Sequence, residues 1–424
     1  MRTWQRRLLR RPVGVACVGM VCLFGAGWGS LSASSDSFPG TSTPGTSVSQ
    51  TKAPAGSPIK VFVFVSENNP VLDAPWAFAG ARAATDEINA AGGVNGHPVK
   101  LTTCNELGNP NAAVHCATQA ASGGYAVAFS AGAEFGALEV PILQKAGIPF
   151  VTEPISGPEL TNPDSFPIAN FAMEFAAFGS AAKKAGVSGV FTTLTYSVAA
   201  ALPLAKLVER GAVAVGFKDG GIVTVSPAAP DYSPTIQRLK DKGSAAVGMV
   251  VAPPGAVQAI RAASNVAFQT AWVVDGAPMD PHNMKLLGQL SDGAVVAEVV
   301  PPWDATSRYP SLATFNASMK RLSAAGVRGA DNPGESAVAS WLAIHGIGKV
   351  AATIQGSVTA SAMTTALRHA HNVDIKGILQ WSPGAPGPAA YPRTDNSTVF
   401  LAKVANGHNM LVGKVNMYQV LKLK

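Results

Sequence analysis

Residues 86–101, DEINAAGGVNGHPVKL, restrict the fold most tightly, because they force a helix to end and a strand to begin within a short stretch. Over 77–91 the apolar residues recur at helical spacing, which predicts an amphipathic helix. Gly92 and Gly93 then end the helix, since glycine adopts the positive φ that a helix C-terminus needs. A strand is predicted over 98–103. The stretch holds no pair of groups able to do chemistry, so its role is architectural.

The same alternation of helix and strand continues along most of the chain. β-Branched and aromatic runs bounded by turn residues predict strands, and periodic apolar segments between them predict helices. Strands are expected at 59–65, 98–103, 125–130, 148–152, 189–194, 214–217, 245–251, 270–274 and 293–299. Helices are expected at 77–91, 111–122, 138–146, 174–185, 199–209, 233–240, 255–263 and 334–353. Strands that alternate with helices of this length form βαβ units and parallel sheets.

Length and element order predict an α/β protein of two doubly wound parallel-sheet lobes joined by a hinge. A chain of 424 residues, 47% of them hydrophobic, can bury two cores. Extended crossings between the lobes are expected near 166–170 and near 290–295. The resulting assignment is 59–168 plus 294–375 for lobe I and 169–293 plus 376–424 for lobe II.

The formal net charge of +7 does not indicate a nucleic-acid partner. Five arginines lie before residue 12, where there are no acids; without them 27 basic residues face 25 acidic ones, a net charge of +2. No run of lysine and arginine interleaved with aromatic residues remains. The chain therefore lacks the electrostatic footprint of a phosphate-binding surface.

The basic N-terminus belongs to a predicted export signal over 1–33. Basic residues precede an uncharged apolar stretch over 13–24, and small residues suited to cleavage follow near Ala33. An uncleaved membrane anchor is the alternative, because the apolar stretch carries no charge. Residues 34–58 are rich in Ser, Thr, Pro and Gly, which predicts a flexible linker.

Two cysteines lie beyond the export signal, Cys104 and Cys116. Exported proteins retain disulfides, so a disulfide that closes this short loop is predicted. A metal site is the alternative, but it would need further ligands, and His115 is the one nearby candidate in the sequence.

Motifs of common hydrolases, metalloenzymes and nucleotide-binding enzymes are missing from the sequence. It contains no GxSxG, HExxH, CxxC or P-loop pattern. Residues 345–351, HGIGKVA, form a degenerate GxGxxA, but they lie inside a predicted helix rather than after a strand, which favours helix packing. We predict no catalytic residue, no cofactor and no metal. An exported two-lobed α/β protein of this kind is best explained as one that closes on a ligand at the carboxyl ends of its strands.

Several stretches resemble the periplasmic binding proteins for branched-chain amino acids, the Leu/Ile/Val-binding family of the type I fold, which serve ABC importers. ATDEINAAGGVNGHPVKL is similar to the run that ends the family's first helix. Residues 109–113 resemble the start of its second helix and 147–151 its fourth strand. Residues 158–161 and 231–234 resemble two further turns. The resemblance extends from about Ile59 to the C-terminus and implies permease and ATPase subunits as partners.

The resemblance also implies where a ligand binds. In the family, an amino acid's carboxylate is held at loops after the third and fourth strands, and its ammonium meets carbonyls and a carboxylate, partly from the second lobe. Carried over by position, these two loops supply Ala133, Glu134, Phe135, Ile155 and Ser156. The covering aromatic residue, the acidic position and the aromatic residue of the first loop fall on Tyr196, Asp275 and Trp76.

Five of the carried-over residues also have a structural alternative. The third-strand loop lacks the family's serine, and Glu134 there disfavours a ligand with a bare carboxylate unless it is a solvated loop acid. Tyr196 would otherwise cover the end of a sheet, and Trp76 would pack in the core. Asp275 would cap the next turn, and Ser156 would cap a short helix that follows it.

The sequence thus predicts an exported solute-binding protein that captures a small polar or amphipathic molecule, such as an amino acid or an amide, and delivers it to an ABC importer. We expect an extracytoplasmic monomer that meets the membrane only through its partner or through an uncleaved N-terminal segment. One alternative is a membrane-tethered ligand-sensing receptor domain of the same fold. Another is a hydrolase acting on a small amide.

Overall fold

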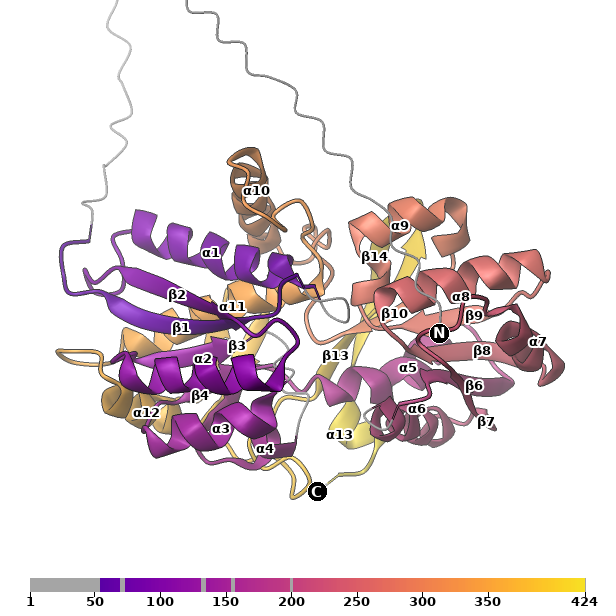
Figure 1. Cartoon of the computed structure of the whole chain (residues 1–424), viewed down its shortest axis with the longest axis horizontal. Helices are drawn as coiled ribbons and strands as arrows, with labels where there is room; N and C mark the ends of the chain where they lie inside the picture. The colour runs from indigo at the N-terminus through magenta and orange to yellow at the C-terminus, as the bar shows by residue number, and fades with distance from the viewer. Residues whose placement is uncertain (1–53, 69–72, 131–134, 154–156, 199–200, 424) are drawn as a thin grey trace, which may run out of the picture. The chain divides into compact units, whose positions relative to one another are not determined.

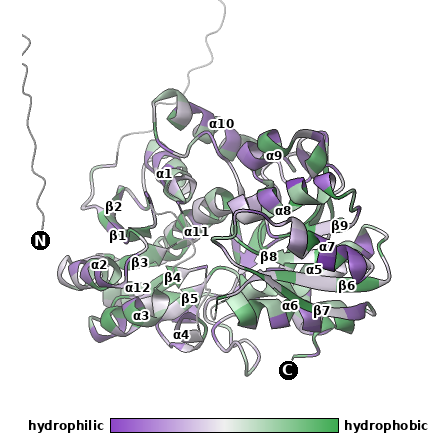
Figure 2. Cartoon of the chain, turned by 45° about the vertical axis from the view of Figure 1, so that its right-hand side comes forward, coloured by the Kyte–Doolittle hydropathy of each residue, from purple (hydrophilic) through white to green (hydrophobic). Residues whose placement is uncertain are grey.

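The computed structural model describes residues 54–68, 73–130, 135–153, 157–198 and 201–423. They form two parallel-dominated sheets, each covered by helices on both faces (Figure 1). This architecture confirms the predicted α/β fold with two doubly wound lobes. Strands such as β8 (Ser244–Val250) are hydrophobic along their length, whereas the outer helix α7 (Ser233–Asp241) carries hydrophilic stretches (Figure 2).

The first sheet contains five parallel strands in the order β2-β1-β3-β4-β5. They are β1 (Ile59–Val65), β2 (Val99–Asn105), β3 (Val127–Ser130), β4 (Phe150–Thr152) and β5 (Ser165–Pro167). Alternate side chains of β1 enter different cores: Val61 and Val63 pack with α1 and α11, and Phe62 and Phe64 pack with α2 and α3. Burial on both faces explains the continuous apolar run of β1, which is typical of a parallel sheet.

Helices from two distant parts of the chain cover this sheet. The early ones are α1 (Pro75–Ala90), α2 (Pro110–Ser122), α3 (Gly136–Lys145) and α4 (Gly157–Thr161). The late ones are α10 (Ser311–Ala324), α11 (Glu335–Ala351) and α12 (Ala360–His369), followed by the hairpin of β11 (Val373–Ile375) and β12 (Leu379–Trp381). The late helices, orange in Figure 1, lie beside α1 and the first sheet.

The second sheet contains seven strands in the order β14-β13-β10-β9-β8-β6-β7. The strands not yet named are β6 (Val190–Tyr196), β7 (Lys218–Val225), β9 (Ala271–Val274), β10 (Val295–Glu298), β13 (Thr398–Ala405) and β14 (His408–Asn416). Only the β10–β13 and β13–β14 pairs are antiparallel among the described strands of this sheet. Its helices are α5 (Ala172–Lys184), α6 (Leu202–Ala214), α7, α8 (Pro253–Asn265), α9 (Pro281–Leu287) and α13 (Met417–Val420), with 3₁₀ helices η2 (Ala277–Met279) and η3 (Gly288–Ser291).

The chain passes between the two sheets three times: after β5, after β10 and after β12. The first crossing follows the expected one near 166–170. The second crossing was expected near 290–295 but lies after β10. β10 pairs with β9 and β13 and therefore belongs to the second sheet. A lobe I segment that begins at 294 thus begins one strand too early. The lobe division as a whole remains a proposal, and its predicted export signal and most of its linker lie outside the described residues.

Most predicted elements are confirmed, with ends that shift by a few residues. The strand predicted at 214–217 is wrong, because Ala214 still belongs to α6 and Gly216 takes φ +92° at the turn that follows. The strand there is β7, which begins at Lys218. The helix predicted at 334–353 is confirmed as α11, and its HGIGKVA run packs as expected: a Cβ at Gly346 would lie 2.8 Å from Ile375. Within the described ranges, no helix combines the length and apolar character needed to cross a bilayer.

Glu87, in the stretch 86–101, is a partly buried carboxylate with four hydrogen-bond donors around it. Its Oε1 accepts from Ser318 Oγ at 2.7 Å and Trp341 Nε1 at 3.1 Å, and its Oε2 accepts from His345 Nε2 at 3.1 Å and Lys376 Nζ at 3.3 Å. Burial alone would raise the pKa of Glu87, but the hydrogen bonds lower it to about 2. One carboxylate thereby joins α1 to α10, α11 and the β11–β12 turn.

The remainder of the stretch determines how the chain passes from α1 to β2. Asn89 pairs with the strand backbone, because its Nδ2 donates to Val99 O at 2.9 Å and its Oδ1 accepts from Val99 N at 2.8 Å. Gly93 adopts φ +76° and closes the helix by donating to Ile88 O at 2.9 Å. Asn95 donates to Ala352 O at 2.9 Å, at the C-terminal end of α11. The architectural role predicted for this stretch is confirmed.

The predicted disulfide between Cys104 and Cys116 is present and joins β2 to α2. Cys116 is buried at 1% exposure and packs with Phe64 and Ala117. The disulfide therefore attaches α2 to the face of the first sheet that α2 covers. It leaves neither thiol free to bind a metal with His115.

We expect Glu87→Gln to destabilise the protein by about 3 kcal/mol, because the amide cannot accept from four donors and leaves Lys376 without its partner. Glu87 has a depressed pKa, so its contribution is present above about pH 4.5 and is lost as the pH falls toward 2. Urea unfolding at several pH values measures both effects. The neighbouring Asp86→Asn, an exposed partner of Arg82, should cost less than about 0.5 kcal/mol; equal costs for both variants would contradict the account.

Replacing both Cys104 and Cys116 by serine should lower the free energy of unfolding by roughly 3 kcal/mol, because the short closed loop no longer restricts the unfolded chain. Thiol labelling of the denatured, non-reduced wild type should find both cysteines blocked. Two free thiols in that experiment would contradict the disulfide.

Candidate functional site

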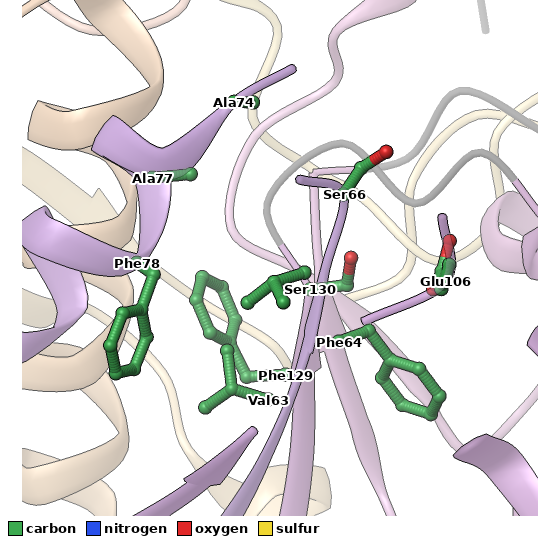
Figure 3. Close-up of a pocket in the computed structure, with 10 residues that line it drawn as sticks. Val63, Phe64, Ser66, Ala74, Ala77, Phe78, Glu106, Phe129 and Ser130 are labelled. Atoms are coloured by element: carbon green, nitrogen blue, oxygen red, sulfur yellow. The ribbon is translucent and has the colours of Figure 1, made fainter. Parts of the chain in front are cut away.

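The carboxyl edge of the first sheet holds a narrow pocket where the strand order reverses direction, between β1 and β3. Ser66 and Ser130 lie at this edge, with Phe78 and Phe129 on one side of the strands and Glu106 on the other (Figure 3). In open α/β sheets this position is the usual ligand crevice. The pocket's volume of about 10 Å³ holds no more than one water.

Four of the predicted site residues, Ala133, Glu134, Ile155 and Ser156, lie outside the described residues. Their loops leave the ends of β3 and β4, at the same edge as the pocket. Phe135, partly exposed, ends the first of these loops at the start of α3, where its carbonyl accepts from Leu138 N at 2.7 Å. Ligand contact by these five residues remains a proposal.

Trp76 and Tyr196 both pack against a hydrophobic core and are both partly exposed. Trp76 lies in the first turn of α1, beside the pocket residue Ala77, and packs on the core of the first sheet. Tyr196 ends β6, where its hydroxyl reaches the first turn of α8: a Cβ at Gly255 would lie 2.3 Å from that oxygen. Burial raises the pKa of Tyr196, and a hydrogen bond with Tyr232 opposes the shift. Both positions suit structural roles, with Trp76 packing on a core and Tyr196 covering the end of a sheet. A ligand role for either residue remains a proposal.

Asp275 lies directly after β9 and caps the next turn, the structural role that the sequence offered as the alternative to ligand binding. Its Oδ1 accepts from Ala277 N at 3.1 Å. Burial raises the pKa of this carboxyl to about 7, although the hydrogen bond from Ala277 lowers it. Turn formation uses one oxygen, so the residue still brings a titratable carboxyl to the carboxyl edge of the second sheet.

Asp275 is one of five acidic residues that the fold gathers, a set we call the carboxyl cluster. The residues are Glu153, Glu174, Asp275, Glu298 and Glu335. They come from the end of β4, the first turn of α5, the end of β9, the end of β10 and the first turn of α11. Both sheets therefore contribute, each from its carboxyl edge, and the four glutamates are no more than 6% exposed.

Two backbone amides hold the centre of the carboxyl cluster. Val299 N–H donates to Glu335 Oε1 at 2.8 Å and to Glu174 Oε1 at 3.3 Å. Gly276 N–H donates to Glu335 Oε2 at 3.2 Å. A Cβ at Gly276 would lie 2.6 Å from Glu335 Oε2 and 3.0 Å from Glu298 Cδ, so only glycine lets the turn after β9 approach these carboxyl groups. Val299 begins the second crossing, which places the cluster at the hinge.

Burial raises the pKa of every member of the carboxyl cluster. The pKa of Glu335 rises to about 8 through burial and the charge of Asp275, against hydrogen bonds from Glu174 and the two amides. Burial and the charge of Glu335 raise the pKa values of Glu153 and Glu174 well above the usual range. Burial and the charge of Glu335 also raise the pKa of Glu298, and the charge of Asp304 raises it further. Like charges in a low-dielectric site cannot all ionise, so protons remain on several of these groups at neutral pH.

Of the five residues, Asp275 was anticipated from the sequence and the four glutamates were missed. Three members end or follow a buried apolar strand, at 153, 275 and 298, and the other two lie in the first turn of an apolar helix. An acid directly after a buried strand is a signal that the sequence carried. Its significance depends on which strands share an edge, and that emerged only from the fold. Within the described residues, no three His, Cys, Asp or Glu side chains are arranged to hold one metal ion.

A family model described as periplasmic binding protein matches residues 74–416. No curated protein sequence matches the chain. The match runs from α1 to the end of β14 and includes every strand of both sheets except β1, all three crossings and the carboxyl cluster.

Solved structures of substrate-binding proteins share the fold. A fatty acid ABC transporter substrate-binding protein from Thermomonospora curvata is 12% identical with a TM-score of 0.70, covering 88% of this chain and 96% of its own. LivJ of Streptococcus pneumoniae, in complex with isoleucine, is 15% identical with a TM-score of 0.67, covering 84% and 100%. A Rhodopseudomonas palustris solute binding protein in complex with 4-hydroxybenzoate is 18% identical with a TM-score of 0.68, covering 85% and 97%.

We expect the free energy of unfolding to fall between about pH 5 and pH 8. Folding raises the pKa of Glu335 from 4.5 to about 8, so the stability from this group is complete below about pH 4.5 and is lost as the pH rises through 8. One such group contributes on the order of 3 kcal/mol over this interval. Urea unfolding measures the slope.

Glu335→Gln, which stays uncharged, should reduce that slope, whereas the exposed control Asp241→Asn should leave it unchanged. A wild-type stability that rises with pH, or a slope that Glu335→Gln leaves intact, would contradict the assignment of protons to the carboxyl cluster.

Proposed function

The chain belongs to the periplasmic binding protein family, and we propose that it is an exported solute-binding protein that captures a small molecule between its two lobes and delivers it to an ABC importer. The observation that carries the proposal is the carboxyl cluster, because it joins the carboxyl edges of both sheets at the hinge. A ligand placed there contacts elements of both lobes at once, as capture by closure requires.

The three crossings suit a closing motion. Glu335 begins α11, which packs against α1, whereas Glu174 lies in the first turn of α5, which packs on the second sheet. Both carboxyl groups accept from the same Val299 amide, at the start of the second crossing. A few hinge residues can absorb the backbone change of closure while the two sheets move as rigid bodies.

The ligand class is a proposal of its own. Proteins of this fold bind chemically diverse solutes, as isoleucine, 4-hydroxybenzoate and fatty acid illustrate among the structures named above. We propose a small polar or amphipathic molecule, such as an amino acid or an amide, with Tyr196 and Trp76 at its apolar parts. Asp275 and the loops after β3 and β4 would supply its polar contacts.

The family implies an extracytoplasmic location and permease partners. We propose that an export signal over 1–33 and a linker over 34–58 precede the binding lobes, that the protein acts as a monomer and that it meets the membrane through its permease. The tethered-receptor alternative depends on whether residues 1–33 are cleaved, and sequencing the N-terminus of the exported protein distinguishes the two.

We expect the purified protein to retain one small molecule per chain. Native mass spectrometry before and after unfolding should show the bound mass and its release. Without a retained molecule, an amino acid, amide or small carboxylate should raise the melting temperature, because a ligand that binds only the native state stabilises it. A chain with no retained mass and no thermal shift with any of these solutes would contradict the proposed function.

A further inference from the structure

We propose that the carboxyl cluster receives the head group of an organic cation, an ammonium or a guanidinium group on a ligand of net positive charge, in exchange for protons. The inference rests on the proposed function and narrows its ligand class. It differs from recognition of a zwitterionic amino acid, in which one carboxylate meets one ammonium and the ligand carries no net charge.

Glu153 is the observation that points to a ligand rather than to a structural role. Its side chain is 0% exposed, and within the described residues neither carboxyl oxygen has a hydrogen-bond partner. The charge it faces is that of Glu335, which belongs to the late segment of the chain. Leaving such a group unpaired is unfavourable, because its desolvation is not offset by any hydrogen bond. One oxygen of Glu298 is likewise buried without a partner among the described residues.

Among the described residues, no positively charged side chain forms an ion pair with the carboxyl cluster. Its members face one another and Asp304, whose other contact is His408 Nδ1 at 3.1 Å. None of the ion pairs formed by the described residues includes a member of the cluster. The missing component is therefore positive charge, and a bound cation would supply it.

The cluster discriminates among ligand charges by simple electrostatics. A ligand carboxylate would add a further anion to five acidic groups and would raise their pKa values again. A neutral ligand would leave the protons in place and gain little from the acids. A cation with several N–H donors pairs with ionised carboxylates through charge-assisted hydrogen bonds, which are about twice as strong as neutral ones.

Exchange of protons for a cation makes the binding affinity depend on pH. A neutral ligand leaves the protons in place, so its affinity does not depend on pH. Each proton released on binding makes the apparent affinity rise up to tenfold per pH unit while the pH lies below the pKa of the group in the free protein. The ligand-free protein loses stability over the same pH range, because folding raises the pKa of Glu335. Affinity and stability should therefore change in opposite directions.

The test compares cations with uncharged molecules of the same shape on the full chain. Choline is matched by 3,3-dimethylbutan-1-ol and putrescine by butane-1,4-diol; agmatine supplies a guanidinium group, and isoleucine and 4-hydroxybenzoate supply a zwitterion and an anion. Isothermal titration calorimetry at pH 6 and pH 8 gives Kd. We expect at least one cation to bind, at least tenfold more tightly at pH 8 than at pH 6, with no binding of its uncharged match.

Glu153→Gln and Glu298→Gln should each weaken cation binding at least tenfold and reduce its pH dependence, because they remove an ionisable partner. Thermal melts of the ligand-free variants should show folded proteins, since glutamine resembles the protonated acid. Asp241→Asn makes the same acid-to-amide change at an exposed position of α7 and should bind cations like the wild type.

Binding of isoleucine, 4-hydroxybenzoate or an uncharged match in preference to every cation would overturn the inference and leave the proposed function standing. Equal binding of Mg²⁺ or Ca²⁺ would overturn it in favour of a metal site. Absence of binding by all probes would also overturn it, and the retained-mass measurement would then decide the proposed function separately.

Discussion

The partly buried carboxylate of Glu87 positions the elements that carry the candidate site. It fixes α1 against the middle of α11 through Trp341 and His345, and Asn95 of the same stretch holds the C-terminal end of α11. The N-terminal end of α11 carries Glu335 into the carboxyl cluster. A stretch without chemistry of its own therefore sets the position and angle of a helix that carries a site residue.

Glu87 and the carboxyl cluster are two contrasting sets of carboxyl groups among the described residues, and the comparison explains what each does. Glu87 has four donors, and its pKa falls to about 2, so it is a permanent anion that fixes structure. The carboxyl cluster has amides for Glu335 but no partner for either oxygen of Glu153 within the described residues, and its pKa values rise. Satisfied groups stabilise one arrangement, whereas unsatisfied ones retain the capacity to bind something else.

Much of the fold could be predicted because it is encoded locally. Helical periodicity, the Gly92–Gly93 stop and the β-branched run of β1 act over a few residues, and the structure follows them. β13 and β14 were missed because their pairing joins an antiparallel hairpin to a parallel sheet through β10, which no local pattern requires. The carboxyl cluster was missed for the same reason: Glu153 and Glu335 meet only because the chain crosses to the second sheet after β5 and returns after β10.

We infer that the carboxyl cluster holds protons at neutral pH and gives them up to a positive ligand. Infrared spectroscopy of the ligand-free protein tests it most directly, because a protonated carboxyl group absorbs apart from an ionised one. We expect a protonated-carboxyl band at pH 7 that shrinks as the pH rises past 8 and when a cation binds, and that is weaker in Glu335→Gln. A spectrum with every carboxyl group ionised at pH 7 would contradict it.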